Sequence, residues 1–446
     1  MSAVASPPAV AVSDRSGRDG FADAYRAELQ KLFAQLATRL LALAALIGPF
    51  AFAAVLNAQS GTPSDALYGA WAHSSGFAIS LVTLGFAGSW AFPIIAGVLA
   101  GDLFASEDRY GTWKTILTRS CTREDVFAGK VLAVSTVAVA IGLLLAAASV
   151  IAGVVLVGAH PLVNLSGALT SPGRMLALTL VSWLYSLLGL LAYVSVGLLL
   201  SIATRNGIIG VLGPLVLALV TQLLDLVGNG VIVHTLLIGS IFDGWHGLFV
   251  THPFLGPMLA SGAVSALWIA ACLVASWRIV RRRDFVTASA PGRANWRRPV
   301  RLVVVAAAAI ALLAVLSRVG PTGVTAARLS AAMGPTFDNV TLLQQALLGR
   351  HAPPTARLDV LPNCNRHGAA AVGPGDWTCT LYVYLPQATS VPFQETSVDY
   401  DVSVEYNGCY KASSPPAFIG GPTMRGAGGA SVANPLFVVY GCFNIY

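Results

Sequence analysis

The chain has 446 residues, of which 55% are hydrophobic and only 11% are charged, and its mean hydropathy is +0.70. A soluble core of this length needs far less apolar surface, so the composition excludes a soluble protein and indicates an integral membrane protein. The formal net charge of +7 does not indicate nucleic-acid binding, because the arginines cluster where apolar runs end, as is typical of membrane proteins.

The amino-terminal region divides into a tail and a helix. Residues 1–20 are rich in Ala, Ser, Pro and Gly and lack the apolar core of a secretory signal, which predicts a disordered cytoplasmic tail. Residues 21–36 place apolar side chains at helical spacing, namely Phe21, Tyr25, Leu29, Leu32 and Phe33. The pattern predicts an amphipathic helix at the inner membrane interface, with its apolar side in the acyl boundary.

Seven apolar runs follow that are long enough to span a bilayer, since about 20 helical residues cross about 30 Å of hydrocarbon. The expected spans are residues 37–58, 77–101, 131–158, 175–203, 207–228, 258–280 and 300–319. The first six lie in a membrane domain over residues 37–285, and a basic cytoplasmic linker, residues 286–299, leads to the seventh. The expected fold class is therefore an all-α polytopic membrane domain with an added seventh helix.

Basic residues predict the orientation of these spans, because Lys and Arg collect on the cytoplasmic side. They precede the first span and crowd the linker before the seventh, and Arg205 separates the fourth span from the fifth. On the other side, the loops 59–76 and 229–257 contain no Lys or Arg, and the loop 159–174 has only Arg174. We therefore expect a plasma-membrane protein with a cytoplasmic amino terminus and an extracellular carboxyl terminus.

The loop 229–257 is too apolar for a solvated connection and too interrupted by Gly and Pro to cross the membrane. Non-helical backbone at membrane depth has to be sheltered by protein. The pattern predicts a re-entrant pair of short helices in the outer leaflet.

The polar segment 101–130 separates the second span from the third. Its charged residues cost too much in hydrocarbon, about 2.5–3.5 kcal/mol each at the bilayer centre, so the segment is expected to be a folded loop at one membrane face. Within it, Trp113, Ile116 and Leu117 form a narrow apolar stripe at helical spacing. This favours a short helix that lies across the membrane face and offers a partner a docking surface.

This segment resembles the cytoplasmic loop between the second and third spans of ATP-binding-cassette type-2 exporter permeases. That loop often reads Glu, a short spacer, Gly-Thr, Leu, a basic residue and a distal Lys. The matching positions here are Glu107, Gly111, Thr112, Leu117, Arg123 and Lys130. The usual Pro before the middle basic residue is absent, because Ser120-Cys121-Thr122 stands there. The resemblance covers about residues 20–285.

The resemblance implies that the segment couples the permease to a cytoplasmic ATPase, which the amphipathic helix 21–36 would also touch. The residues expected to carry the coupling are Glu107, Gly111, Thr112, Trp113, Leu117, Arg119, Arg123 and Lys130. No GxxxxGK[ST] motif occurs in the chain, so ATP and Mg²⁺ are expected on a separate ATPase subunit and no cofactor on this chain. Two ATPases and two permease copies would form the assembly, with this chain as a homodimer in the lipid bilayer.

In the resembled exporters the second and fifth spans line the substrate route. The residues expected to line it here are Trp90, Phe92, Thr221, Gln222 and Asp225. Asp225 is the best candidate because an intramembrane charge points to function. Packing between spans, and for Asp225 snorkelling to the outer headgroups, are alternatives that the sequence leaves open.

Residues 320–446 differ from the rest of the chain and predict a small β-rich extracellular domain. The segments 377–385 and 398–406 alternate apolar and polar residues strictly, which is typical of half-buried strands, and a short helix is expected at 337–348. The domain holds Cys364, Cys379, Cys409 and Cys442, which predict two disulfides outside the cell. Three connectivities exist, and we weakly favour Cys364 with Cys379 and Cys409 with Cys442.

Neither metal binding nor catalysis is indicated. The histidines have no ligand spacing, no CxxC pair exists, and no GxSxG or HExxH motif occurs. The sequence therefore favours a permease subunit, not itself an enzyme, that couples ATP hydrolysis by another subunit to efflux of a hydrophobic or amphipathic substrate. The alternative is a membrane-anchored extracellular sensor or assembly protein without transport activity.

Overall fold

The structure is a computed structural model of the chain. It describes residues 17–59, 66–113, 122–227, 231–283, 323–350, 357–368, 370–384 and 395–445. Most of the predicted tail, the linker 286–299 and the seventh span 300–319 lie outside these residues.

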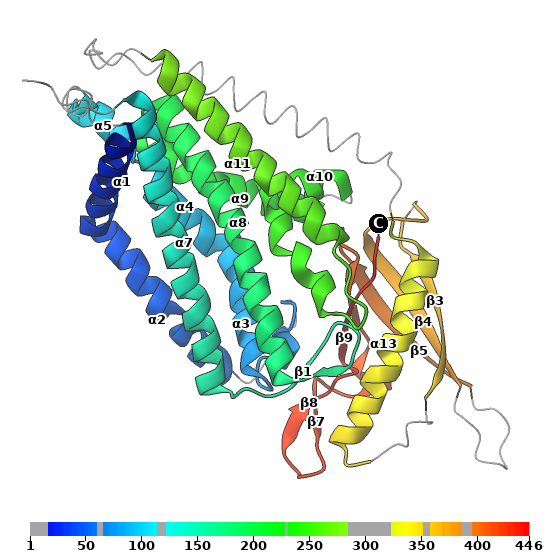
Figure 1. Ribbon diagram of the computed structural model, residues 1–446. Helices are drawn as coiled ribbons and strands as arrows, with labels where there is room; N and C mark the ends of the chain where they lie inside the picture. The colour runs from blue at the N-terminus through cyan, green and yellow to red at the C-terminus, as the bar shows by residue number, and fades with distance from the viewer. Residues whose placement is uncertain are drawn as a thin grey trace, which may run out of the picture.

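Six helical stretches in the described residues are long and apolar enough to cross a membrane. They are α2 (Leu36–Ala58), the run from α3 to α5 (Gly76–Tyr110), α7 (Arg123–Leu156), α8 (Pro172–Thr204), α9 (Gly207–Val227) and α11 (Gly256–Arg282). They lie side by side in one bundle (Figure 1). The prediction of a polytopic helical membrane domain is confirmed.

The helix before the first span, α1 (Gly17–Ala34), packs along α7. Leu32 is fully buried and Glu28 is 9% exposed, whereas Phe33 is 57% exposed. A Cβ on Gly129 of α7 would lie 2.9 Å from the Cβ of Ala24, so the glycine allows the close approach of the two helices. A helix is present where the amphipathic helix 21–36 was predicted, with bounds at Gly17 and Ala34, and much of its inward side faces protein and not the acyl boundary.

The second membrane stretch is irregular near its centre. It consists of α3 (Gly76–Phe86), a π-helical turn η2 (Ala87–Ala91) and α4 (Phe92–Ala100), with Pro93 at the start of α4. Proline lacks an N–H group and clashes with the preceding turn, so the regular hydrogen-bond ladder is interrupted here. The turn places the side chain of Trp90 at the surface, 43% exposed.

Glycines allow neighbouring spans to touch backbone to backbone. A Cβ on Gly153 of α7 would lie 2.1 Å from the carbonyl oxygen of Gly76 in α3. A Cβ on Gly210 of α9 would lie 2.2 Å from the carbonyl oxygen of Gly101. Small residues at helix contacts are a common means of packing spans in lipid, where no hydrophobic force draws helices together.

Short elements gather at the end of the bundle opposite α5 (Ala105–Tyr110), which we call the distal end (Figure 1). They are η1 (Gly69–Trp71), the hairpin of β1 (Leu162–Val163) and β2 (Leu169–Thr170), and η4 (Gly244–Phe249). Two further short elements, α10 (Val231–Leu236) and η3 (Ile238–Phe242), lie deeper along α11 and α8. The last three occupy the segment for which a re-entrant pair of helices was predicted.

The carboxyl-terminal domain is an antiparallel sheet with a helix packed on it. The sheet order is β3 (Asp359–Arg366), β4 (Gly375–Tyr384), β5 (Glu395–Val404), β6 (Cys409–Ser413) and β9 (Val438–Cys442), and the helix is α13 (Ala326–Leu347). The minor elements are α14 (Pro416–Ile419) and the hairpin of β7 (Thr423–Arg425) and β8 (Ser431–Ala433). The predicted β-rich domain is confirmed, and its helix is longer than the predicted 337–348.

Alternation along the strands places one face of the sheet in the domain core. Trp377 and Cys379 of β4 and Tyr400 and Val402 of β5 are each at most 2% exposed. Disulfides join Cys364 to Cys379 and Cys409 to Cys442, and each pair lies directly opposite across two neighbouring strands. The connectivity that the sequence weakly favoured is confirmed.

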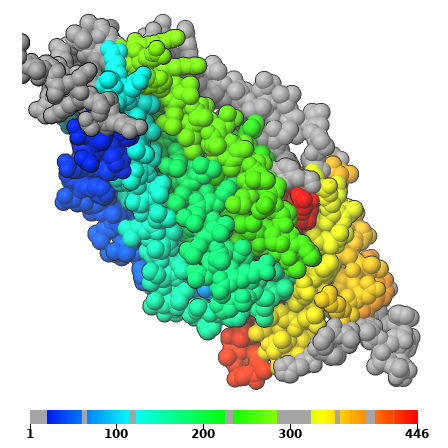
Figure 2. Space-filling model, viewed as in Figure 1, coloured from blue at the N-terminus to red at the C-terminus, as the bar shows by residue number. Residues whose placement is uncertain are grey.

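The domain contacts the distal end of the bundle directly (Figure 2). The Tyr406 hydroxyl donates to Asp243 Oδ2 at 2.9 Å, and the Tyr406 ring stacks on His234 with centroids 4.9 Å apart. Asn339 of α13 donates to the Ser166 carbonyl in the β1–β2 hairpin at 2.8 Å. Both the sheet and its helix are therefore anchored to the membrane domain.

Candidate functional site

The candidate site is the segment 101–130, and its two helix ends are fixed by local sequence. Gly111 ends α5 with φ of +66°, a left-handed conformation that glycine adopts without steric cost. Thr122 and Asp125 form a capping box at the start of α7, in which each side chain accepts from the other residue's backbone N–H. This cap starts α7 at Arg123, well before the predicted span at 131. Residues 114–121 lie outside the described part of the chain.

Four charged side chains meet between α1, α5 and α7, and we call them the Glu107 cluster: Glu28, Lys31, Glu107 and Lys130. Lys130 Nζ lies 2.6 Å from Glu28 Oε1 and 3.1 Å from Glu107 Oε1. Lys31 Nζ lies 2.5 Å from the same Glu107 oxygen. Two carboxylates thus face two ammonium groups, and the cluster is neutral as a whole.

The Glu107 cluster is shielded from solvent on most sides. Lys130 is fully buried and Glu107 is 5% exposed, whereas the Lys31 side chain is 38% exposed. The Lys130 ammonium lies 5.6 Å from the centroid of the Phe104 ring, and the Thr112 hydroxyl donates to Glu107 Oε2. A buried charge is strongly destabilising without its partner, so these side chains hold the three helices in one arrangement.

Lys31 shows the electrostatic balance at the exposed rim of the cluster. Burial alone would lower the pKa of Lys31, but the hydrogen bond that Lys31 donates to Glu107 and the negative charges of Glu28, Glu107 and Asp102 raise this pKa above its usual value overall. Lys31 is therefore a charged ammonium at neutral pH. It leaves Glu107 with two cationic neighbours from two different helices.

A second group of contacts joins α5 to the end of α11. Asp108 Oδ1 accepts from Trp113 Nε1 at 2.8 Å and from Arg283 Nη2. Arg123 at the start of α7 donates to the Arg283 carbonyl at 2.9 Å and to the Arg281 carbonyl at 3.3 Å. The end of the sixth span is thereby tied to both sides of the segment 101–130.

Among the described residues of the segment, the outward face of α5 is accessible. Tyr110 is 71% exposed, and the Arg109 guanidinium lies 5.0 Å from the centroid of its ring. Arg109 also pairs with Asp102 at 2.8 Å in an exposed salt bridge. Asp102 lies beside Gly207 at the start of α9, where a glycine Cβ would lie 2.1 Å from Asp102 Oδ1. Among the described residues, α5 therefore presents an aromatic and a cationic side chain to a partner.

The structure corrects the expected position of Trp113. It is 5% exposed and stacks on Phe104, with ring centroids 6.1 Å apart, so it does not belong to an exposed apolar stripe. The reason is that its indole N–H is held by Asp108, which turns the ring inward. Of the other predicted coupling residues, Glu107, Thr112 and Lys130 come together in the buried cluster, Gly111 forms the turn and Arg123 contacts α11. Leu117 and Arg119 lie outside the described residues.

The residues expected to line a substrate route separate into different environments. Phe92 is fully buried and packs edge to face on Trp183, so the structure places it in the core and not on a surface. Gln222 Nε2 donates to the Ser89 carbonyl in η2 at 2.9 Å. Thr221, 4% exposed, donates to a carbonyl of its own helix. The side chain of Asp225 lies outside the described part of the chain.

The link between Gln222 and Ser89 shows that the second and fifth spans contact each other at the irregular turn. Trp90 lies next to this contact and is partly exposed. The π-helical turn frees backbone carbonyls, and a side-chain amide from α9 satisfies one of them.

Sequence reasoning missed four residues of the site: Glu28, Lys31, Asp108 and Arg283. One signal could have found the first two. Lys130 stands in an apolar run, FAGKVLAV, and a lysine in such a place needs an acidic partner on a neighbouring element. Glu28 and Lys31, one helical turn apart on α1, supply that charge and its balance. The pairing of Asp108 with Arg283 had no such signal.

Comparison with known proteins covers the helical part of the chain. Residues 25–224 match the family model described as ABC-2 family transporter protein. The match runs from α1 into α9 and includes the whole Glu107 cluster. No curated protein matches the chain.

Proposed function

We propose, on the premise that residues 25–224 belong to the ABC-2 transporter family, that the chain is the permease subunit of an ATP-driven exporter. The chain is a multi-pass membrane protein with six apolar helices in its described residues. The ATPase, with its ATP and Mg²⁺, is a separate subunit, and this chain itself catalyses no reaction. The transported molecule is hydrophobic or amphipathic.

One observation carries the proposal: the buried Glu107 cluster joins α5 to α1 and α7 through ion pairs between Glu107, Lys31, Lys130 and Glu28. The ATPase contacts the exposed face of α5, at Arg109 and Tyr110. When the ATPase moves α5, the ion pairs make α1 and α7 move together with α5 as one rigid body. Rigid-body movement of helices is a usual way to convert a local binding event into a change of access.

The route for the substrate lies between the second and fifth spans, where Trp90 is exposed and Gln222 bonds to Ser89. A π-helical turn followed by Pro93 gives α4 a point about which it can pivot when α5 is displaced. Movement at the α5 end would thereby change the helix packing around Trp90.

The orientation follows from charge and redox chemistry. Arg205, Arg281, Arg282 and Arg283 lie at helix ends on the α5 side of the bundle, and Lys and Arg favour the cytoplasmic side. The two disulfides lie in the domain at the distal end, and disulfides persist in oxidising compartments. In our proposal the α5 end is cytoplasmic, the domain at residues 323–445 is extracellular, and the location is the plasma membrane.

A second copy of the chain completes the exporter as a homodimer. The spans α2, α9 and α11 have the smallest buried fractions, 22%, 22% and 17%, against 67% for α8. These three spans offer apolar faces to lipid and to a second copy.

Co-purification tests the proposal. The full chain, affinity-tagged and co-expressed with a candidate ATPase subunit from the same organism, should retain that ATPase after membrane extraction. Tyr110→Ala should weaken retention at least about tenfold, whereas Tyr384→Ala in the distal sheet should not. A chain that folds but retains no ATPase would contradict the proposal and favour the sensor or assembly protein, whose function would reside in the carboxyl-terminal domain.

A further inference from the structure

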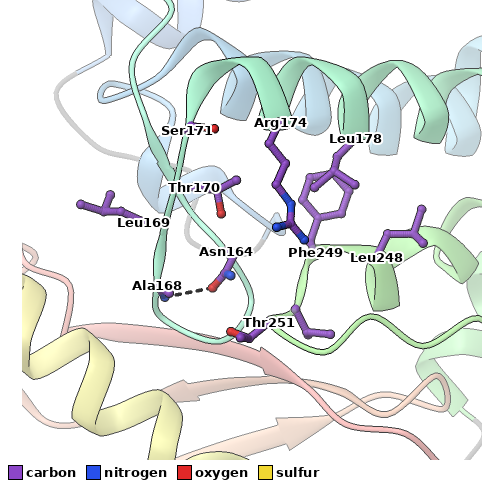
Figure 3. A pocket seen from close by; sticks show the side chains of 11 residues that line it. Asn164, Ala168, Leu169, Thr170, Ser171, Arg174, Leu178, Leu248, Phe249 and Thr251 are labelled. Carbon is purple, nitrogen blue, oxygen red and sulfur yellow. Dashed lines mark hydrogen bonds between the residues drawn. The ribbon is translucent and has the colours of Figure 1, made fainter. Parts of the chain in front are cut away.

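A pocket of about 280 Å³ opens at the distal end, between the β1–β2 hairpin, the start of α8 and η4 (Figure 3). Its polar lining includes Asn164, Thr170, Thr251 and Arg174, and its apolar lining includes Leu178 and Leu248. Figure 3 shows the Arg174 side chain extending from α8 into the space between the hairpin and η4. The pocket is far from the Glu107 cluster and plays no part in the proposed coupling.

The groups that line the pocket are rich in hydrogen-bond donors. The Arg174 guanidinium, which carries five N–H groups, forms no hydrogen bond or ion pair with the described residues, and no Asp or Glu is among the residues that line the pocket. Asn164 Oδ1 accepts from the backbone N–H groups of Ser166 and Ala168, at 3.0 and 2.9 Å. Because these bonds fix the orientation of the amide, its Nδ2 donors remain for another acceptor.

Both the helix dipole and the usual distribution of basic residues in membrane proteins disfavour an arginine at position 174. It lies in the first turn of α8, where the partial positive charge of the helix makes a cation unfavourable. It is also the only Lys or Arg in the three loops 59–76, 159–174 and 229–257. An arginine on the extracellular side of a span runs against the usual distribution of basic residues. Arg174 is exposed, so a ligand of opposite charge can reach its guanidinium.

The position and size of the pocket limit the ligand. Arg174 begins one of the six apolar stretches, so it lies at the level where a bilayer has its headgroups. Leu178 follows one turn later and faces the same pocket, which gives a ligand a polar end and an apolar side. Drug-sized ligands occupy pockets of about 300–1,000 Å³, so this pocket suits a small charged group and not a whole transported amphiphile.

We propose that this pocket binds a phosphate group through Arg174 and Asn164, and that the source is the headgroup of an anionic phospholipid of the outer leaflet. The planar guanidinium binds two phosphate oxygens at once, a geometry that lysine cannot reproduce. The acyl chains of the lipid lie along the outer half of α8, past Leu178. The contact attaches the hairpin, and with it Asn339 of the extracellular domain, to the membrane surface.

Native mass spectrometry of the delipidated full chain, titrated with phosphatidylglycerol, tests this site. The unmodified chain should bind one tight lipid, Arg174→Gln should bind it at least about tenfold more weakly, and Arg174→Lys should fall between them. Arg425→Gln, at an exposed arginine in β7, serves as the matched control and should bind normally. Thermal unfolding of each variant verifies that it is folded.

A competition experiment with inorganic phosphate distinguishes the two possible sources of the bound phosphate group, a lipid headgroup and phosphate in solution. If phosphate displaces the lipid only at concentrations far above those of the lipid, the headgroup is the ligand. If phosphate binds as tightly and depends on Arg174 in the same way, the phosphate site stands and its ligand comes from solution. Equal lipid binding by the folded Arg174→Gln variant, or an equal loss in Arg425→Gln, overturns the proposal.

Discussion

Lys130 Nζ lies 2.6 Å from Glu28 Oε1, and this contact joins two residues 102 positions apart in the chain. It connects the helix that precedes the first span to the beginning of the third. Lys130 is fully buried, so the contact belongs to the interior of the protein although both residues are charged. The two described parts of the segment, residues 101–113 and 122–130, are thereby fixed parts of the bundle.

We predict that Lys130→Met destabilises the chain by about 3–5 kcal/mol, the usual loss when one partner of a buried ion pair is removed. It leaves Glu28 and Glu107 to share Lys31 alone. The double variant Lys130→Met with Glu28→Gln restores neutrality and should recover part of the loss. Thermal unfolding of the purified chain in detergent measures both. Arg26→Gln, at an exposed position of α1, is the control, and a Lys130→Met variant as stable as this control would refute the prediction.

Gly153→Ala should destabilise the bundle by about 1–3 kcal/mol, the range for an overpacked core. The added Cβ would lie 2.1 Å from the Gly76 carbonyl oxygen, so the backbones of α3 and α7 would have to separate. Gly48→Ala in α2 has no atom within 4 Å of its Cβ and should be neutral or stabilising by up to about 1 kcal/mol. Unfolding temperatures of the two variants that do not differ would contradict this explanation.

The contact between the carboxyl-terminal domain and η4 should weaken in acid. Burial lowers the pKa of His246 to about 3. Its Nδ1 lies 3.2 Å from Asn407 Nδ2, its Nε2 lies 3.9 Å from Asp243 Oδ1, and His234 and Tyr406 lie nearby. An exposed histidine has a pKa of about 6.5. Below this pH, His246 therefore binds a proton in the unfolded state but not in the folded state. The contribution of His246 to the free energy of unfolding is therefore fully present above about pH 6.5, and it falls by up to about 1.4 kcal/mol per pH unit below that pH.

The measurement is the free energy of unfolding between pH 5 and 7 for the unmodified chain and His246→Gln. The variant has no proton to gain at this position, so its stability should vary less with pH. Parallel pH profiles for the two proteins would exclude His246 as the cause.

Both disulfides should contribute to the stability of the carboxyl-terminal domain. Cys364–Cys379 closes a separation of 15 residues and Cys409–Cys442 one of 33. In the chain-entropy account, their removal costs about 3 and about 3.7 kcal/mol. Double Cys→Ala variants of each pair, followed by near-ultraviolet circular dichroism during thermal unfolding, measure the two losses. A larger loss for the shorter pair would show that factors other than loop closure dominate.

Much of the fold could be predicted because local patterns in the sequence determine its helices and strands. Apolar runs identify the spans, and strict alternation around Tyr400 and Val402 identifies the sheet. These two signals are local, and no knowledge of distant contacts is needed to interpret them. The cysteine pairing was only weakly favoured by the sequence, and the strand register of the structure, which places Cys364 opposite Cys379, decides it.

The site could be predicted only in part, because its geometry depends on contacts between distant elements. The motif identified Glu107 and Lys130, but Glu28 comes from a helix that was predicted to lie at the membrane interface and not against α7. Trp113 fitted an exposed stripe by spacing alone, and Asp108 turns it inward. Phe92 fitted a lining position by its place in the second span, and its neighbours in α8 bury it. Spacing gives the faces of a helix but not which face meets protein.

The most direct test of the account is the ATP hydrolysis rate of the separate ATPase reconstituted in liposomes with the full chain. We predict that the chain stimulates hydrolysis, that Tyr110→Ala reduces the stimulation at least about tenfold, and that Tyr384→Ala leaves it unchanged. Tyr110 is 71% exposed on α5, so its loss should not impair folding. Full stimulation by the Tyr110→Ala variant, or no stimulation by the unmodified chain, would contradict the claim that the α5 face is where the ATPase drives this permease.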